Sequence, residues 1–127
     1  MNYFVIIIGG GIGAISRYGL SKLIYRLFVG NFPIGTLIVN LLGCILIGFL
    51  TGLFERFIIS SSIRLFIFIG FLGGFTTFSS YSLETFNLIK NKELIMAVLN
   101  LLLSNILGII FVFLGLIISR FFISIIK

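Results

Sequence analysis

An apolar stretch that begins after Arg64 is interrupted at its centre by glycines and hydroxylated residues before it meets Glu84. The interrupting residues are Gly73, Gly74, Thr76, Thr77, Ser79 and Ser80. In hydrocarbon every backbone N–H and C=O needs a partner, so irregular backbone at membrane depth persists only against protein or beside a water-filled path. The Gly-Gly-x-Thr-Thr pattern therefore predicts a broken spanning helix, where freed carbonyls and hydroxyls meet something polar, most simply an ion.

The composition places the whole chain in a membrane. Of its 127 residues, 60% are hydrophobic and 9% are charged, and the mean hydropathy is +1.34, values that exclude a soluble domain. At roughly 20 apolar residues per spanning helix, this length accommodates about four helices. We therefore predict one integral membrane domain over residues 1–127. The first apolar run lacks a basic leader, so we interpret it as a retained helix and not as a signal peptide.

Charged and turn-forming residues divide the chain into four apolar runs. The predicted helices cover, approximately, residues 3–28, 34–54, 65–89 and 94–122. Asn31 and Pro33 mark the first turn, residues 60–62 the second, and the charged segment 90–93 the third. Because all connections are short, the expected fold class is an all-α bundle of four transmembrane helices with its third helix broken and both termini on one side.

The basic residues give no bias between the two sides of the membrane. The side with the termini carries Arg56, Arg64, Arg120 and Lys127, and the other side carries Lys22, Arg26, Lys90 and Lys92. An excess of Lys and Arg normally fixes orientation, so this balance predicts insertion both ways and an antiparallel, dual-topology homodimer. A single orientation set by other factors is the alternative. The formal net charge is +6. Because the basic residues that carry it flank apolar runs, we expect their partners to be lipid headgroups and not nucleic acid.

Several small residues have a packing interpretation. Gly9 with Gly13, and Gly48 with Gly52, form pairs at four-residue spacing, which lets helix backbones approach closely in lipid. Cys44 is the only cysteine. It therefore forms no disulfide within the chain, and we expect a small buried side chain at this position.

Three polar residues lie inside the predicted spans, and each has two readings. Arg17 is an interface anchor or structural partner, or else part of an electropositive vestibule that concentrates anions. Asn40 binds another helix, or else offers its NH2 donors to a permeating species. Glu84 suggests proton coupling, but it also lies close enough to Lys90 and the interface for a structural pairing.

Aromatic and polar side chains gather beside the break. Phe78 and Tyr81 are three residues apart and share a helix face. Their positive ring edges, together with hydroxyl and amide donors, offer an anion partial positive charge without a fixed charge that would trap it. In the fourth run Asn100, Ser104 and Asn105 raise the same question as Asn40, and Asn100 and Ser104 share a helix face, which favours a polar stripe. No histidine is present and no nucleophile is accompanied by a base, so we do not expect an enzyme.

Three segments carry a resemblance to a known family: GGGIGAISRY at 9–18, GTLIVNLLGCILIG at 35–48 and GFLGGFTTFSSYSLE at 70–84. In these segments the chain resembles the Fluc/CrcB fluoride channels, once named for camphor resistance, and the likeness covers essentially the whole length. The third segment is the most specific. The resemblance implies a multi-pass protein of the bacterial inner membrane that pairs as an antiparallel homodimer and passively exports cytoplasmic fluoride.

The resemblance also implies roles for individual residues. The backbone carbonyls of Gly73 and Thr76 from both subunits would hold a structural sodium ion (Na+) that is not transported. The fluoride pore would be lined by Asn40, Phe78, Tyr81, Ser79, Ser80 and Ser104. Arg17 and Glu84 would match the family's basic and acidic positions, as vestibule or structural charges. The chain reads TTFSSY where the family usually reads TTFSTF, so its second aromatic carries a hydroxyl.

The sequence thus favours a fluoride-selective ion channel over one alternative transporter, a small dual-topology proton-coupled multidrug exporter. Such an exporter also uses four helices and paired inverted subunits, but it needs a carboxylate in the middle of the first helix. Residues 3–28 contain none. A purely structural subunit would leave the polar break at 73–77 and Asn40 without a reason.

Overall fold

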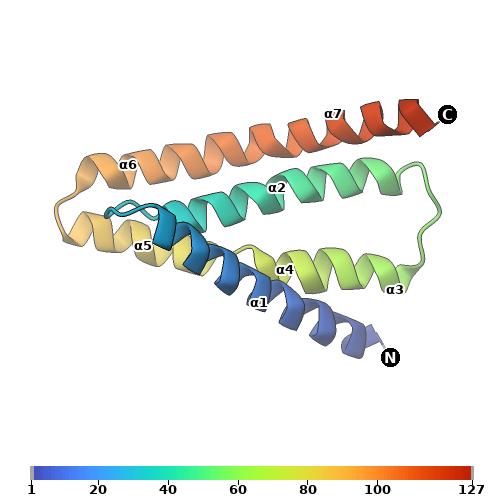
Figure 1. Cartoon of the computed structure of the whole chain (residues 1–127), viewed down its shortest axis with the longest axis horizontal. Coiled ribbons are helices and arrows are strands. Elements are labelled where there is room, and N and C mark those ends of the chain that lie inside the picture. Colours follow the sequence, from blue (N-terminus) through green and yellow to red (C-terminus); the bar gives the residue numbers. More distant parts are fainter. Residues whose placement is uncertain (1, 127) are drawn as a thin grey trace.

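A computed structural model describes residues 2–126 as four long helical segments (Figure 1). The first is α1 (Asn2–Leu27) and the second is α2 (Ile34–Phe54). The third comprises α3 (Ser61–Arg64), the π-helical η1 (Leu65–Leu72), α4 (Gly73–Phe75) and α5 (Phe78–Lys90). The fourth comprises α6 (Leu94–Leu102), the π-helical η2 (Leu103–Leu107) and α7 (Gly108–Ile126). All four segments are long and apolar enough to cross a membrane, which confirms the prediction of an all-α, four-span protein.

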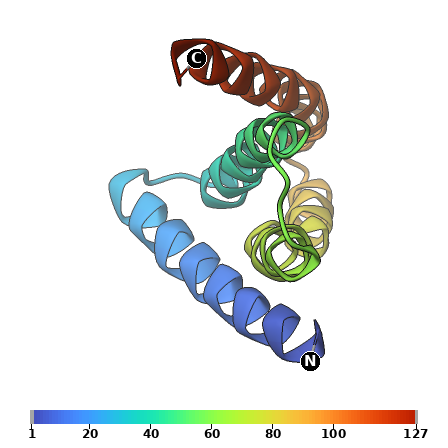
Figure 2. The same cartoon turned by 90° about the vertical axis from the view of Figure 1, so that its right-hand side faces the viewer.

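The segments alternate in direction, so that the N- and C-terminal ends lie at the same end of the bundle (Figure 1). Helix α2 packs along α7, and α1 packs on η1 and α4. The end view shows α1 crossing the outside of the third segment, far from α7 (Figure 2). Helix α1 therefore packs against both the third segment and α2, whereas α7 packs along α2 on the far side.

The glycine pairs lie at the closest helix contacts. Gly9 and Gly13 face the backbone of η1, and Gly48 faces the backbone of Val112 in α7. Gly52 faces Ser119 of the same helix. A β-carbon at any of these four glycines would run into its neighbour. The packing interpretation of both pairs is confirmed, because a side chain at any of these positions would prevent the helices from approaching so closely.

Two helix boundaries differ from the prediction. Ser60 Oγ accepts a hydrogen bond from the amide of Ile63 and caps α3, so the third segment begins at Ser61, inside the serine run that was predicted to form the turn. The fourth segment continues to Ile126 instead of ending near Phe122, because the apolar sequence continues past Arg120. Lys127, which was counted with the basic residues, lies outside the described part of the chain.

Most large apolar side chains of the described chain point outwards. Among residues 2–126 the largest fully buried side chains are those of Val39, Asn100 and Ser119. Long faces of α1 and α7 expose isoleucine, leucine and phenylalanine. Such apolar faces suit contact with lipid tails or with another membrane protein, because both surroundings are apolar.

Candidate functional site

The third segment leaves the helical conformation at Thr76 and Thr77. Both residues have extended backbones, with ψ values of 156° and 118°. The Thr76 amide still donates to the Leu72 carbonyl at 3.0 Å, which closes α4. The Thr77 hydroxyl accepts from the Ser80 amide at 3.2 Å and caps the start of α5. The interruption therefore falls within the Gly-Gly-x-Thr-Thr stretch, and one threonine begins the helix that follows it.

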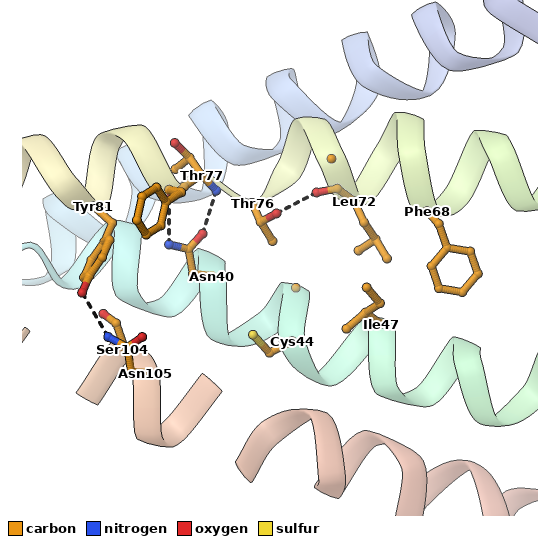
Figure 3. Close-up of a pocket in the computed structure, with 13 residues that line it drawn as sticks. Asn40, Cys44, Ile47, Phe68, Leu72, Thr76, Thr77, Tyr81, Ser104 and Asn105 are labelled. Atoms are coloured by element: carbon orange, nitrogen blue, oxygen red, sulfur yellow. Dashed lines mark hydrogen bonds between the residues drawn. The ribbon is translucent and has the colours of Figure 1, made fainter. Parts of the chain in front are cut away.

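Asn40 of α2 satisfies the backbone exposed by this interruption (Figure 3). Its Oδ1 accepts from the Thr77 amide at 2.8 Å, and its Nδ2 donates to the Thr77 carbonyl at 3.0 Å. Thr77 is only 9% exposed, so these two bonds replace hydrogen bonds that water cannot provide there. Asn40 therefore binds another helical segment, which was the first of the two roles predicted for it. The second hydrogen of its Nδ2 is used by no hydrogen bond within residues 2–126.

The two hydrogen bonds from Asn40 to Thr77 form a clamp, and beside it two backbone carbonyls are left without partners. In a continuous α-helix the Thr77 amide would donate to the Gly73 carbonyl, but here it donates to Asn40. Within residues 2–126, no hydrogen bond ends on the carbonyl oxygen of Gly73 or of Thr76. Unpaired carbonyls of unwound helices are the groups that coordinate Na+ in membrane proteins. One chain supplies two such oxygens, which is too few to surround a cation.

A cavity of about 380 Å³ opens at the break, between α2, the third segment and η2 (Figure 3). Six of the ten predicted site residues line it: Asn40, Gly73, Thr76, Phe78, Tyr81 and Ser104. Gly43, Cys44, Ile47, Phe68, Leu72, Thr77 and Asn105 complete the lining. The cavity thus combines aromatic, hydroxyl and amide groups and carries no charged side chain.

The two aromatic rings of the predicted pore lie together but differ in exposure. The centroids of Phe78 and Tyr81 are 5.5 Å apart, with their planes inclined at 48°. Tyr81 is 8% exposed, whereas Phe78 is 78% exposed. The phenyl ring of Phe78 therefore stands at the open side of the cavity, where this chain alone does not cover it.

Ser79 and Ser80 do not line the cavity. Their side chains cluster with the Thr77 hydroxyl at the start of α5, with Thr77 Oγ1 3.1 Å from Ser80 Oγ and 3.4 Å from Ser79 Oγ. Ser104 faces the cavity and donates to Asn100 Oδ1 at 3.4 Å. Of the three predicted serines, Ser104 is therefore the one that the fold places on the cavity wall.

The two predicted charges lie away from this cavity. Glu84 accepts a hydrogen bond of 2.7 Å from the Thr36 hydroxyl, and its other oxygen is buried without a partner. It lines a second cavity of about 320 Å³ toward the first and third turns. Within residues 2–126 it forms no ion pair with Lys90. Arg17 is half-buried on α1, lines neither cavity, and makes no hydrogen bond within the described chain.

Sequence reasoning missed three members of the site. Thr77 supplies the backbone that Asn40 binds, and Cys44 is half-buried on the cavity wall instead of fully buried in the core. Asn105 was predicted to bind another helix or a permeating species, but it was not assigned to the pore. It reaches the cavity from η2, a π-helical turn. Such wide turns are frequent at functional sites, but the sequence pattern does not reveal them.

Comparison with known proteins identifies the family. A sequence model described as "CrcB-like protein, Camphor Resistance (CrcB)" matches residues 4–116. The chain belongs to the CrcB family. Because this match extends from α1 into α7, all four spans, the clamp on Thr77 and the cavity lie inside the CrcB region.

Curated CrcB relatives match along nearly their whole length. A protein of Parabacteroides distasonis is 48% identical over 127 residues, covering 100% of this chain and 99% of the relative. One from Coxiella burnetii (strain CbuK_Q154) is 49% identical, covering 94% and 98%. One from Hydrogenobaculum sp. (strain Y04AAS1) is 45% identical, covering 91% and 94%. All three are named "Fluoride-specific ion channel FluC". This CrcB chain is accordingly a multi-pass bacterial membrane protein.

Proposed function

We propose that this chain is a fluoride-selective ion channel through which cytoplasmic fluoride leaves the cell down its electrochemical gradient. The names of the curated relatives support this function. The observation that carries it is the cavity at the break, which is lined by hydrogen-bond donors and aromatic rings and by no charged side chain. A small, strongly hydrated anion needs dense donors to replace its water, but a fixed positive charge would hold it too tightly to pass.

The donors of the cavity come from different elements. Asn40 of α2 keeps one amide hydrogen after it has bound Thr77. Tyr81 and Phe78 of α5 present aromatic rings, whose edges carry partial positive charge. Ser104 lines the cavity from η2, although its hydroxyl proton is donated to Asn100 Oδ1. Each of these groups contributes only a partial charge, so fluoride binds weakly enough to leave the cavity again.

The membrane potential supplies the driving force for export. An interior potential of about −100 mV favours the exit of one negative charge by about 2.3 kcal/mol. Fluoride enters in its protonated, uncharged form from an acid medium and is trapped as the anion inside. A passive path for the anion is then sufficient to lower cytoplasmic fluoride, with no coupling to another solute.

A second copy of the chain completes the site in this proposal. Phe78 stands at the cavity mouth with most of its ring uncovered, and the unpaired carbonyls of Gly73 and Thr76 supply two of the ligands that a cation needs. An inverted copy would bring two more carbonyls to a shared Na+ and would cover Phe78. The sodium ion would hold the two broken segments together and add a favourable field for anions. The balanced basic residues support the inverted arrangement.

The proton-coupled exporter is not favoured. Its mechanism requires a carboxylate in the middle of the first span, and α1 contains no acidic residue. The carboxylates of the chain are Glu55, Glu84 and Glu93. Glu84 is bound by Thr36 and lies outside the cavity at the break.

Fluoride release from liposomes tests the function. The purified chain is reconstituted into vesicles loaded with potassium fluoride and potassium chloride, and external fluoride is followed with an electrode after valinomycin is added. We expect fluoride to leave rapidly and chloride to stay inside. Release that requires a pH gradient, release of organic cations, or no release at all would overturn the proposal.

A further inference from the structure

The hydroxyl of Tyr81 is held by one side chain of the fourth segment. Asn105 Nδ2 donates to the Tyr81 hydroxyl oxygen at 3.1 Å (Figure 3). The same nitrogen donates to the Leu101 carbonyl at 2.7 Å. Both hydrogens of this amide group are therefore in use, one on each acceptor.

The Leu101 carbonyl decides which way the Asn105 amide points. A carbonyl oxygen accepts hydrogen bonds and cannot donate them, so the atom 2.7 Å from it must be the nitrogen and not Oδ1. Tyr81 consequently receives a hydrogen bond from Asn105 and does not give one. Within residues 2–126 the Tyr81 hydroxyl makes no other hydrogen bond, so its own proton remains free.

Tyr81 and Asn105 both line the cavity at the break, together with Ser104. Asn105 has spent both of its donors on Leu101 and Tyr81, so it has none left for an anion. Tyr81 has a free O–H in the same cavity, and a hydrogen bond received by a hydroxyl oxygen strengthens the one that it donates. Its ring is almost completely buried and packs against Phe78, so the hydroxyl position is well defined.

We propose that Asn105 is a positioning residue that orients the Tyr81 hydroxyl as a proton donor to the permeating anion. The inference rests on the proposed function and deepens it, because it assigns the role of one hydroxyl on the ion path. The π-helical turn η2, which carries both Ser104 and Asn105, lets adjacent residues reach the same cavity. Asn105 acts through Tyr81 and does not itself contact the ion.

A double-mutant cycle tests this role with two readouts. Tyr81→Phe, Asn105→Leu and the double variant are purified as dimers, and each is measured for thermal unfolding and for fluoride release from liposomes. Asn105→Leu leaves the hydroxyl of the almost fully buried Tyr81 without a partner and should lower the unfolding midpoint. Tyr81→Phe leaves only the exposed Asn105 amide, which still donates to Leu101, and should change the midpoint little. The double variant removes both partners and should recover the midpoint. Fluoride release should fall about tenfold in both single variants, which corresponds to about 1.4 kcal/mol, and should stay about tenfold low in the double variant.

The other outcomes overturn the inference in distinct ways. A purely structural pair would restore fluoride release in the double variant together with the unfolding midpoint. Independent roles would multiply the losses to about a hundredfold in the double variant. Undiminished release by Tyr81→Phe would also overturn the inference, and this test stands even where Asn105→Leu yields no dimer. Ser124→Ala, at an exposed position in α7, should leave release unchanged. If the unsubstituted chain releases no fluoride, the proposed function fails instead.

Discussion

Replacement of Asn40 by leucine should destabilise the protein severely, because one side chain satisfies two buried backbone groups. Asn40→Leu removes the bonds of 2.8 Å and 3.0 Å to the Thr77 amide and carbonyl. Each buried group left without a partner costs about 1–3 kcal/mol. With two such groups, the free energy of unfolding should fall by about 2–6 kcal/mol. Asn40→Asp would set a carboxylate oxygen against the Thr77 carbonyl at membrane depth, so it should not restore the lost stability.

Reversible unfolding in mixed micelles, followed by the loss of tertiary structure, measures these differences. Asn87→Leu is the matched control, since Asn87 is an exposed asparagine of α5 whose side chain makes no hydrogen bond within residues 2–126. The control should change the free energy of unfolding by less than about 0.5 kcal/mol. A loss below about 1 kcal/mol in Asn40→Leu would mean that water or lipid headgroups reach Thr77, and the clamp would no longer explain how the break is stabilised.

Three further substitutions and one change of buffer probe the same region. Thr76→Ser keeps the hydroxyl that donates to Leu72, so this variant should conduct fluoride normally. Gly43→Ala would drive a methyl group into the Thr76 side chain. This variant should fail to assemble, as judged by size-exclusion chromatography. Phe78→Ile should abolish fluoride release while the protein still purifies as a dimer, and undiminished release would remove Phe78 from the ion path. Dialysis of the purified protein into sodium-free potassium buffer should reduce release, and full activity after complete exchange would argue against a structural Na+.

Much of the fold follows from patterns that are local in sequence. Four apolar runs separated by charged and turn residues give the four spans, because each span needs about 20 apolar residues. The spacing of Gly9 and Gly13 marks a helix contact without reference to the partner. The stretch around Thr76 and Thr77 marks the interruption, because glycine and hydroxylated residues are poorly suited to a continuous apolar helix.

The remaining features depend on contacts between distant parts of the chain. Glu84 was expected near Lys90, but its hydroxyl partner Thr36 is 48 residues away. Asn105 faces Tyr81 across 24 residues and from a π-helical turn, whose register differs from the 3.6-residue period that sequence reasoning assumes. Arg17 was predicted to be an interface anchor or structural partner, or else part of a vestibule, and it lies outside both cavities. Local patterns thus identify candidate polar residues, and the packing of the spans selects among them.

The central claim is that the ion path forms between two copies that cross the membrane in opposite directions, and the orientation of individual chains tests it most directly. A single cysteine is placed at exposed Ser124, near the C-terminal end of α7, in a Cys44→Ala background. Intact cells are treated with a membrane-impermeant maleimide before and after permeabilisation. Because the basic residues are balanced, about half of the chains should be labelled from outside, and nearly all after permeabilisation. Labelling of all chains or of none from outside would show a single orientation and contradict the inverted pair.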